Sequence, residues 1–355
     1  MSRVPRSNVF SPSEVAIAHL SNRVVRRCFL FGKDVLTGVS YDHRKGWIDE
    51  LIQHFAANFG IDLLAFALMS NHLHLVLRSR PDVVETWSDA EVARRWLMIC
   101  RCSKKDTNPD AHPTDAEISR ICNSPHRVKE VRLRLSDFSW WMRLLCQRIA
   151  QRANQEDKAT GKFWESRFNG VRICDEASLL ACAAYVDLNP IRAAMATKLE
   201  TSEYTSVKRR IEALVAKSDA AAGALDDQTD QAAFLAPLSI NEHQDEPGPR
   251  PSKAGKRCSD KGFLPMSTQA YLELLDWTAR TCILGKKGKT PGHLPPVLVR
   301  LKISSATWEE LVTSFGKLFR QVAGHPEAIS SDRVKSGRVR QLHLGRRARE
   351  LFAAI

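Results

Sequence analysis

The chain has 355 residues, with 43% hydrophobic and 26% charged side chains and a net charge of +13. This composition excludes a wholly disordered chain and suits about two domains with a full core. The excess of basic residues makes a polyanion the first partner to test.

Neither a membrane span nor a secretory leader is expected. The sequence has no run of about 18 apolar residues, and residues 1–6 lack the apolar stretch of a signal peptide. The nine cysteines contain no CxxC pattern, which argues against a zinc ribbon or a disulfide framework. We therefore expect reduced thiols in a cytoplasmic protein.

Apolar periodicity predicts an α+β domain over residues 11–214. In chain order, the patterns predict a strand at 15–23, a helix at 46–58, strands at 61–69 and 72–78, a long amphipathic helix at 128–149, a strand within 161–173 and a helix at 175–195. Ser70 and Asn71 are turn residues, so the second and third strands should form a hairpin. Ser136 and Asp137 can interrupt the long helix.

The composition changes at about residue 215. Residues 215–262 are rich in Ala, Asp, Gln, Pro and Gly, which predicts a flexible linker. Residues 263–355 are predicted to form a small basic helical module. One helix there is expected to start at a capping box from Thr307 to Glu310 and to continue to Val322.

Two histidines on the predicted strand 72–78 are the first candidates for chemistry. Because side chains alternate along a strand, His72 and His74 lie on one face, about 6.6 Å apart at Cα. This spacing suits a shared metal ion. Two ordinary histidines on a half-exposed strand would show the same pattern, so the motif alone leaves both interpretations open.

Tyr185 and Asn189 form the second candidate pair. One helical turn separates them, so the phenol is a candidate nucleophile and the amide oxygen a candidate metal ligand on the same side. Alternatively, Tyr185 is a core tyrosine with a satisfied hydroxyl, and Asn189 caps a helix that begins at Pro190.

Basic residues surround both elements, and guanidinium groups hold phosphates through paired donors. A solvated surface has the same composition, so these residues are candidates only. They are Arg23, Arg26, Arg27, Lys162, Arg167 and Arg172, with Arg192 as a further candidate after Tyr185.

Four separated segments resemble the HUH single-tyrosine transposases, and more closely the branch of REP-associated tyrosine transposases. They are HLSNR at 19–23, MSNHLHLVL at 69–77, GKFWESRF at 161–168 and DEASLLACAAYVDLNPIRA at 175–193. The four occur in the expected order, and the resemblance covers roughly residues 11–210.

The resemblance implies a ferredoxin-like antiparallel sheet with packed helices. It also implies that His72 and His74 are metal ligands, Tyr185 is the nucleophile and Asn189 is the third ligand. The implied activity is DNA transposition by cleavage and rejoining of single-stranded or hairpin DNA through a 5′-phosphotyrosine link, in a bacterial cytoplasm at the nucleoid. The expected cofactor is Mg²⁺ or Mn²⁺, and the ligand set suits Mn²⁺ better. One tyrosine per site suggests a homodimer.

Two features depart from the smallest relatives. About 110 residues separate His74 from Tyr185, so we expect a helical insertion at about residues 79–160. Residues 283–302 carry five Lys/Arg and no acid, and our hypothesis is that residues 263–355 contact DNA as a second unit, against the alternative of a purely structural tail. For the whole chain, the alternatives are a domesticated repeat-processing nuclease and a non-catalytic DNA-binding regulator.

Overall fold

The computed structural model describes residues 8–25, 28–34, 36–100, 112–221, 230–240, 248–283 and 294–353. The strands are β1 (Ile17–Arg23), β2 (Ile61–Leu68), β3 (His72–Ser79), β4 (Asn169–Ile173) and β5 (Val322–Ala323). The helices of the first half are α1 (Arg44–Asn58), α2 (Pro81–Glu85), α3 (Asp89–Ile99), α4 (Asp115–Cys122), α5 (Pro125–Leu135) and α6 (Phe138–Glu156). Those of the second half are α7 (Glu176–Asp187), α8 (Asn189–Arg192), α9 (Ser206–Ala221), α10 (Thr268–Thr278), α11 (Pro296–Arg300), α12 (Ser305–Leu318), α13 (Pro326–Lys335) and α14 (Arg346–Phe352), with a 3₁₀ turn η2 (Leu199–Thr201) and a π-helical turn η3 (Ala279–Ile283). None of the described helices is both long and apolar enough to cross a membrane.

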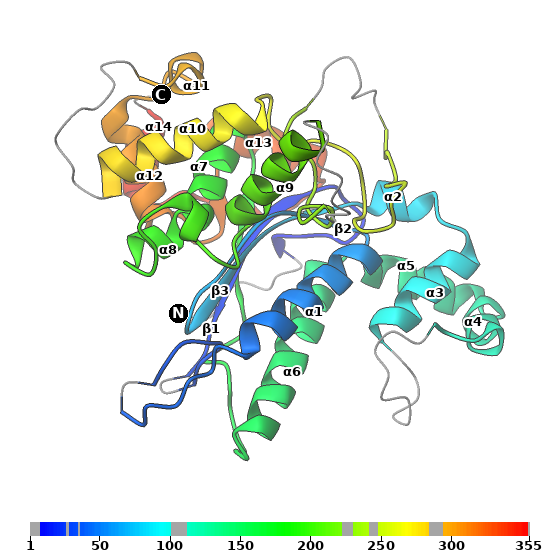
Figure 1. Cartoon of the computed structure of the whole chain (residues 1–355). Helices are drawn as coiled ribbons and strands as arrows, with labels where there is room; N and C mark the ends of the chain where they lie inside the picture. The colour runs from blue at the N-terminus through cyan, green and yellow to red at the C-terminus, as the bar shows by residue number, and fades with distance from the viewer. Residues whose placement is uncertain are drawn as a thin grey trace.

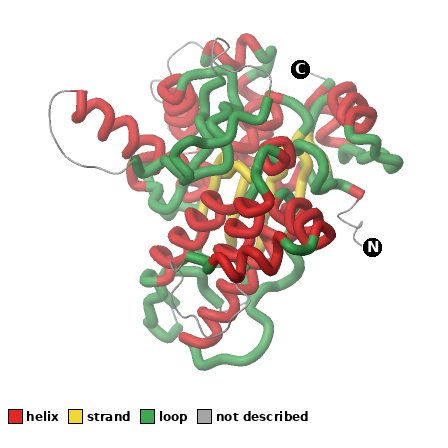
Figure 2. The backbone as a smooth tube through the Cα atoms, turned by 90° about the vertical axis from the view of Figure 1, so that its right-hand side faces the viewer, coloured by secondary structure: helices red, strands yellow, loops and turns green. Residues whose placement is uncertain are grey.

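A five-stranded sheet separates two layers of helices (Figures 1 and 2). The strand order is β2-β3-β1-β4-β5, and all neighbours are antiparallel except β4 and β5. The first four strands, with α1 and α6 on one face, have the ferredoxin-like arrangement. The predicted α+β class is therefore confirmed, and β5 extends the sheet by one parallel strand.

Alternation along β3 explains how one strand serves both layers. Leu73, Leu75 and Leu77 lie in the core that contains residues of α1 and α6. Val76 lies in the second core, with residues of α7, α10 and α12. His72 and His74 share the face of Val76, so they point toward the α7 layer.

The predicted elements differ from the observed ones mainly at their ends. The long helix is two helices, because Asp137 caps α6 by accepting from Ser139 N at 2.6 Å. Since α6 packs on α1, it belongs to the ferredoxin-like core, and the inserted helices are α2 to α5. The strand within 161–173 is shorter than predicted, and the helix predicted at 175–195 stops at Asp187 before the short α8.

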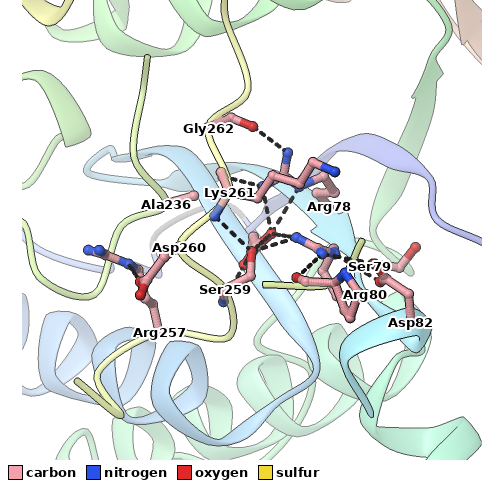
Figure 3. A network of polar contacts seen from close by, with 12 residues as sticks. Arg78, Ser79, Arg80, Asp82, Ala236, Arg257, Ser259, Asp260, Lys261 and Gly262 are labelled. Atoms are coloured by element: carbon pink, nitrogen blue, oxygen red, sulfur yellow. Dashed lines mark hydrogen bonds and ion pairs between the residues drawn. The ribbon is translucent and has the colours of Figure 1, made fainter. Parts of the chain in front are cut away.

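Parts of the segment expected to be a flexible linker pack on the domain, at residues 234–238 and 257–262. Arg78 Nε donates to Asp62 Oδ2 at 2.9 Å, and Ser259 N donates to Asp62 Oδ1 at 2.9 Å (Figure 3). Arg78 Nη1 also donates to the Gly262 carbonyl at 2.8 Å. Together with the buried side chains of Phe234, Leu235 and Cys258, this network holds the segment against β2 and β3.

The residues after 263 share the core of the first domain. β5 pairs with β4, and α12 packs along α7. The predicted capping box is wrong: Ser304 caps α12 by accepting from Thr307 N at 3.1 Å, so Thr307 lies inside the first turn. Val322 lies in β5 rather than in the helix. The last quarter of the chain therefore adjoins the helix that carries Tyr185.

Candidate functional site

Three imidazoles meet on the sheet face that α7 covers. His72 and His74 lie two residues apart on β3, and His19 lies on the neighbouring strand β1. The ring centroids of His72 and His74 are 5.0 Å apart, and those of His19 and His74 are 5.1 Å apart. The strand thus brings the two predicted histidines together, and the register of β1 adds a third.

Each of the two β3 imidazoles uses its Nδ1 atom in a hydrogen bond. His72 Nδ1 lies 2.7 Å from Asn71 Oδ1, and because that oxygen can only accept, Nδ1 of His72 is the donor. His74 Nδ1 lies 2.9 Å from His19 Nε2, where either nitrogen can be the donor. The Nε2 atom of His72 therefore keeps its lone pair, as metal binding requires.

Burial keeps the three imidazoles neutral. It lowers the pKa of His19 to about 4, and burial together with the charges of Arg23 and Arg192 lowers the pKa of His72 to about 4. Burial and the neighbouring His19 hold the pKa of His74 well below its usual value. Near neutral pH the rings are uncharged, while the two arginines provide a positive field that suits an anion.

Tyr185 enters this site from α7. Asp175 caps that helix by accepting from Ser178 N at 2.8 Å, and α7 packs on β2 and β3. The Tyr185 ring is edge-on to His74, with centroids 5.4 Å apart, and to His19 at 5.8 Å. Its hydroxyl makes no hydrogen bond with any described residue, so no group in that part of the chain holds it.

Arg192 and α12 complete the surroundings of Tyr185. The Arg192 guanidinium lies 4.6 Å from the centre of the Tyr185 ring, and its Nη2 donates to the Thr313 carbonyl at 2.8 Å. Its Nη1 is buried and has no partner in the described part of the chain. The ring of Phe315 packs against the ring of Tyr185, with their centroids 5.7 Å apart. A guanidinium nitrogen without a partner beside the phenol is suited to hold an anion.

Asn189 is buried one turn after Tyr185, at the start of α8. Its side chain makes no capping hydrogen bond, so the alternative of an N-cap for a helix beginning at Pro190 is wrong. Among the described residues, its Nδ2 atom has no partner although it is buried. An unpaired buried N–H donor is costly, and this cost makes Asn189 Nδ2 a candidate hydrogen-bond donor to a group bound in the site.

The residue types of the predicted ligand set suit a divalent cation. The part of the chain that the structure describes holds no group of three His, Cys, Asp or Glu side chains suited to a metal ion. A cation would therefore rely on the imidazoles of His72 and His74 and on the amide oxygen of Asn189. Two nitrogen donors and one oxygen donor suit Mn²⁺ or a later transition metal better than Mg²⁺.

One of the predicted basic residues borders the histidines, and two more lie on the adjoining segment. Arg23 pairs with His72 across β1 and β3, and its carbonyl accepts from Glu165 N at 2.9 Å. Lys162 and Arg167 are exposed on the segment that contains this contact. The segment before β4 therefore runs beside the end of β1.

Other predicted basic residues are not brought to the site. Arg172 is only 2% exposed, and its guanidinium donates to Glu14 at 2.7 Å and to Asp332 at 2.8 Å. The prediction that it contacts DNA is wrong, because two carboxylates already occupy its donors. Arg26 and Arg27 lie outside the described residues.

Three residues of the site were not singled out for chemistry in the sequence. His19 is part of the first motif, but only the pairing of β1 with β3 places it against His74. Phe315 and Gly316 lie on α12, about 130 residues after Tyr185. The periodicity of α12 identifies Phe315 as a buried residue, whereas no local pattern predicts which helix it will face.

Gly316 leaves room for the Tyr185 hydroxyl. A Cβ atom at this position would lie 3.0 Å from Tyr185 Oη. We expect Gly316→Ala to shift the phenol by a few tenths of an ångström and to slow its reactions about tenfold. Helix propensity should at the same time raise the free energy of unfolding by about 0.5–1 kcal/mol. Reaction of the Tyr185 phenol with a tyrosine-selective reagent measures the first effect, and chemical unfolding measures the second.

Gly46 of α1 provides the matched control. A Cβ atom there would have no neighbour within 4 Å, so Gly46→Ala should give the gain in stability with unchanged reactivity of Tyr185. Equal reactivity of Gly46→Ala and Gly316→Ala would show that the contact with Gly316 does not position the phenol.

Comparisons with known proteins give one structural likeness. No protein-family model and no curated protein matches the sequence. A solved structure of a REP-associated tyrosine transposase bound to a REP hairpin is similar, with 11% sequence identity and a TM-score of 0.33. The alignment covers 60% of this chain and 86% of that chain.

Proposed function

We propose that this protein cleaves and rejoins single-stranded DNA through Tyr185. The observation that carries the proposal is the position of the Tyr185 ring beside His74, with their centroids 5.4 Å apart, in a site flanked by Arg23 and Arg192. A phenol, neutral imidazoles and unpaired positive charge in one place are the parts needed to attack a phosphodiester.

The chemistry proceeds by exchange of one ester bond for another. The Tyr185 oxygen bonds to the phosphorus, and the bond from phosphorus to the O3′ atom breaks. The 5′ phosphate then remains on the tyrosine, and the O3′ atom leaves as a free hydroxyl. The proton that the phenol loses balances the proton that O3′ gains. Because one phosphoester replaces another, a 3′ hydroxyl can reverse the reaction without an external energy source.

Residues of this chain hold the phosphate and the phenol in place. The unpaired Nη1 of Arg192 can donate to a phosphate oxygen next to the tyrosine. The Phe315 ring packs against the Tyr185 ring, with centroids 5.7 Å apart, and restricts the movement of the phenol. A divalent cation held by His72, His74 and Asn189 would, when bound, offset charge on a phosphate oxygen as the phosphorus is attacked.

A denaturation-resistant complex tests this function. The purified chain is incubated with end-labelled single-stranded oligonucleotides, some of which form hairpins, in the presence of Mn²⁺. We expect a labelled protein band that survives denaturing electrophoresis and an equal yield of DNA with a free 3′ hydroxyl. If no oligonucleotide in a broad hairpin library forms the complex, a non-catalytic DNA-binding regulator becomes the better interpretation.

Binding should depend strongly on salt. We expect Arg23→Ala to weaken hairpin binding and to reduce by about one the slope of log affinity against log salt concentration, because one phosphate contact is lost. Titrations at several salt concentrations measure this slope. Arg94→Ala is the control, since Arg94 lies on α3 in the other helical layer and is paired with Glu91. Equal slopes for the two variants would contradict a phosphate contact of Arg23.

A further inference from the structure

The hydrogen bond between His19 and His74 bears on how the candidate metal site is prepared. His74 can bind a cation through Nε2 only if its proton is on Nδ1. A neutral imidazole in water places its proton on either nitrogen, so an unassisted His74 would spend part of its time in the form that cannot bind. The hydrogen-bond partner of His74 Nδ1 therefore decides which fraction of the protein can bind a cation through His74 Nε2.

His72, the other candidate ligand on β3, shows how a neighbouring side chain can fix the position of the ring proton. His72 Nδ1 lies 2.7 Å from Asn71 Oδ1, an atom that can only accept, so its proton is fixed on Nδ1. His74 Nδ1 likewise has a side-chain partner, His19 Nε2 at 2.9 Å, although here either nitrogen can be the donor. In both β3 imidazoles, Nδ1 thus takes part in a hydrogen bond with a neighbouring side chain, and Nε2 remains available to bind a cation.

The surroundings of His19 favour its role as the acceptor. His19 is 4% exposed, and its Nε2 lies 2.9 Å from His74 Nδ1, so the ring is held inside the site with one nitrogen facing His74. Its ring is stacked on His74 with an angle of 17° between the planes, and it is edge-on to Phe315 at 5.8 Å between centroids. These contacts fix the direction of Nε2 toward His74.

We infer that His19 is a positioning residue that holds His74 in the Nδ1–H form by accepting its proton in a hydrogen bond, which leaves Nε2 of His74 to bind the cation. The inference rests on the metal site of the proposed function. It gives a role in the site to the first motif, whose histidine lies more than 50 residues before the metal ligands. Hydrogen bonds of this kind to a ligand's second nitrogen commonly change metal affinity about 10–100-fold.

The first test reads the proton position directly in the full chain without metal. Selective ¹⁵N labelling of histidine and long-range ¹H–¹⁵N spectra near neutral pH distinguish the two forms, and the loss of one signal in His74→Gln assigns it. We expect wild-type His74 in the Nδ1–H form. A wild-type His74 protonated on Nε2 would overturn the inference, whatever the variants do.

The second test measures Mn²⁺ affinity by calorimetry in three variants. His19→Phe keeps a planar ring but has no acceptor, and we expect about 10–100-fold weaker binding. His19→Gln offers an amide oxygen as acceptor and should recover most of the affinity. His54→Phe is the control, because His54 lies on α1 in the other helical layer and its Nε2 contacts the Met98 carbonyl. Unchanged affinity in folded His19→Phe would overturn the inference.

These measurements separate this inference from the proposed function. The spectrum and the calorimetry need no DNA and no turnover, whereas the function is tested by the covalent complex with an oligonucleotide. A protein that forms the complex but has His74 protonated on Nε2 would retain the function and lose the role of His19. A protein with the expected proton position and affinities but no complex with any substrate would keep the role of His19 and lose the function.

Discussion

Tyr185→Phe is expected to bind hairpin DNA as well as the wild type and to form no covalent complex with it. The substitution removes only the hydroxyl oxygen, and that oxygen makes no hydrogen bond with a described residue, so the fold should not change. Loss of a nucleophile commonly lowers the rate by at least about 10⁴-fold. Denaturing electrophoresis with a labelled oligonucleotide measures the complex, and fluorescence anisotropy measures binding.

Tyr204→Phe serves as the matched control for this variant. Tyr204 precedes α9 and lies near Lys45 rather than near the histidines. It should form the covalent complex at the wild-type rate. If Tyr185→Phe still forms the complex, another residue is the nucleophile, and mapping the labelled peptide would identify it.

The second large effect is expected on stability. Arg172→Met should lower the free energy of unfolding by about 3–5 kcal/mol, because it leaves Glu14 and Asp332 without their shared partner in a largely buried place. The guanidinium joins the segment before β1, the strand β4 and the helix α13, so its loss affects three parts of the fold at once. Chemical unfolding followed by circular dichroism measures the change.

Arg167→Met provides the comparison for this prediction. Arg167 is exposed five residues earlier in the chain, and the change should alter the free energy of unfolding by less than about 0.5 kcal/mol. For DNA affinity we expect the reverse order. Arg167→Met should weaken binding more than Arg172→Met, since the exposed arginine is the candidate contact. If Arg172→Met had the same unfolding midpoint as the wild type, the buried ion pairs would contribute little to the free energy of unfolding.

Patterns within short segments predict much of the fold. The alternation in residues 72–78 correctly places three leucines on one face and both histidines on the other. The apolar run after Gly60 and the turn at Ser70 and Asn71 correctly predict the hairpin of β2 and β3. Such predictions succeed because the period of side chains along one element depends only on that element.

Relations between distant segments are harder to predict. Arg172 has the same local sequence whether it faces solvent or two carboxylates, and only the positions of Glu14 and Asp332 decide. The segment 215–262 has the composition of a linker, yet Ser259 completes a buried network with Asp62 and Arg78. In each case the deciding partner lies more than 150 residues away, where periodicity carries no information.

The contact between α12 and Tyr185 has a consequence for biosynthesis. The strands that carry the histidines are translated first, and the helix with the tyrosine follows. Phe315 and Gly316 leave the ribosome much later, and β5 after them. Because domains tend to fold from the N-terminal side during synthesis, a nascent chain would hold an unfinished reactive centre until its last helices dock. The surroundings of Tyr185 in ribosome-bound chains would thereby differ from those in the released protein.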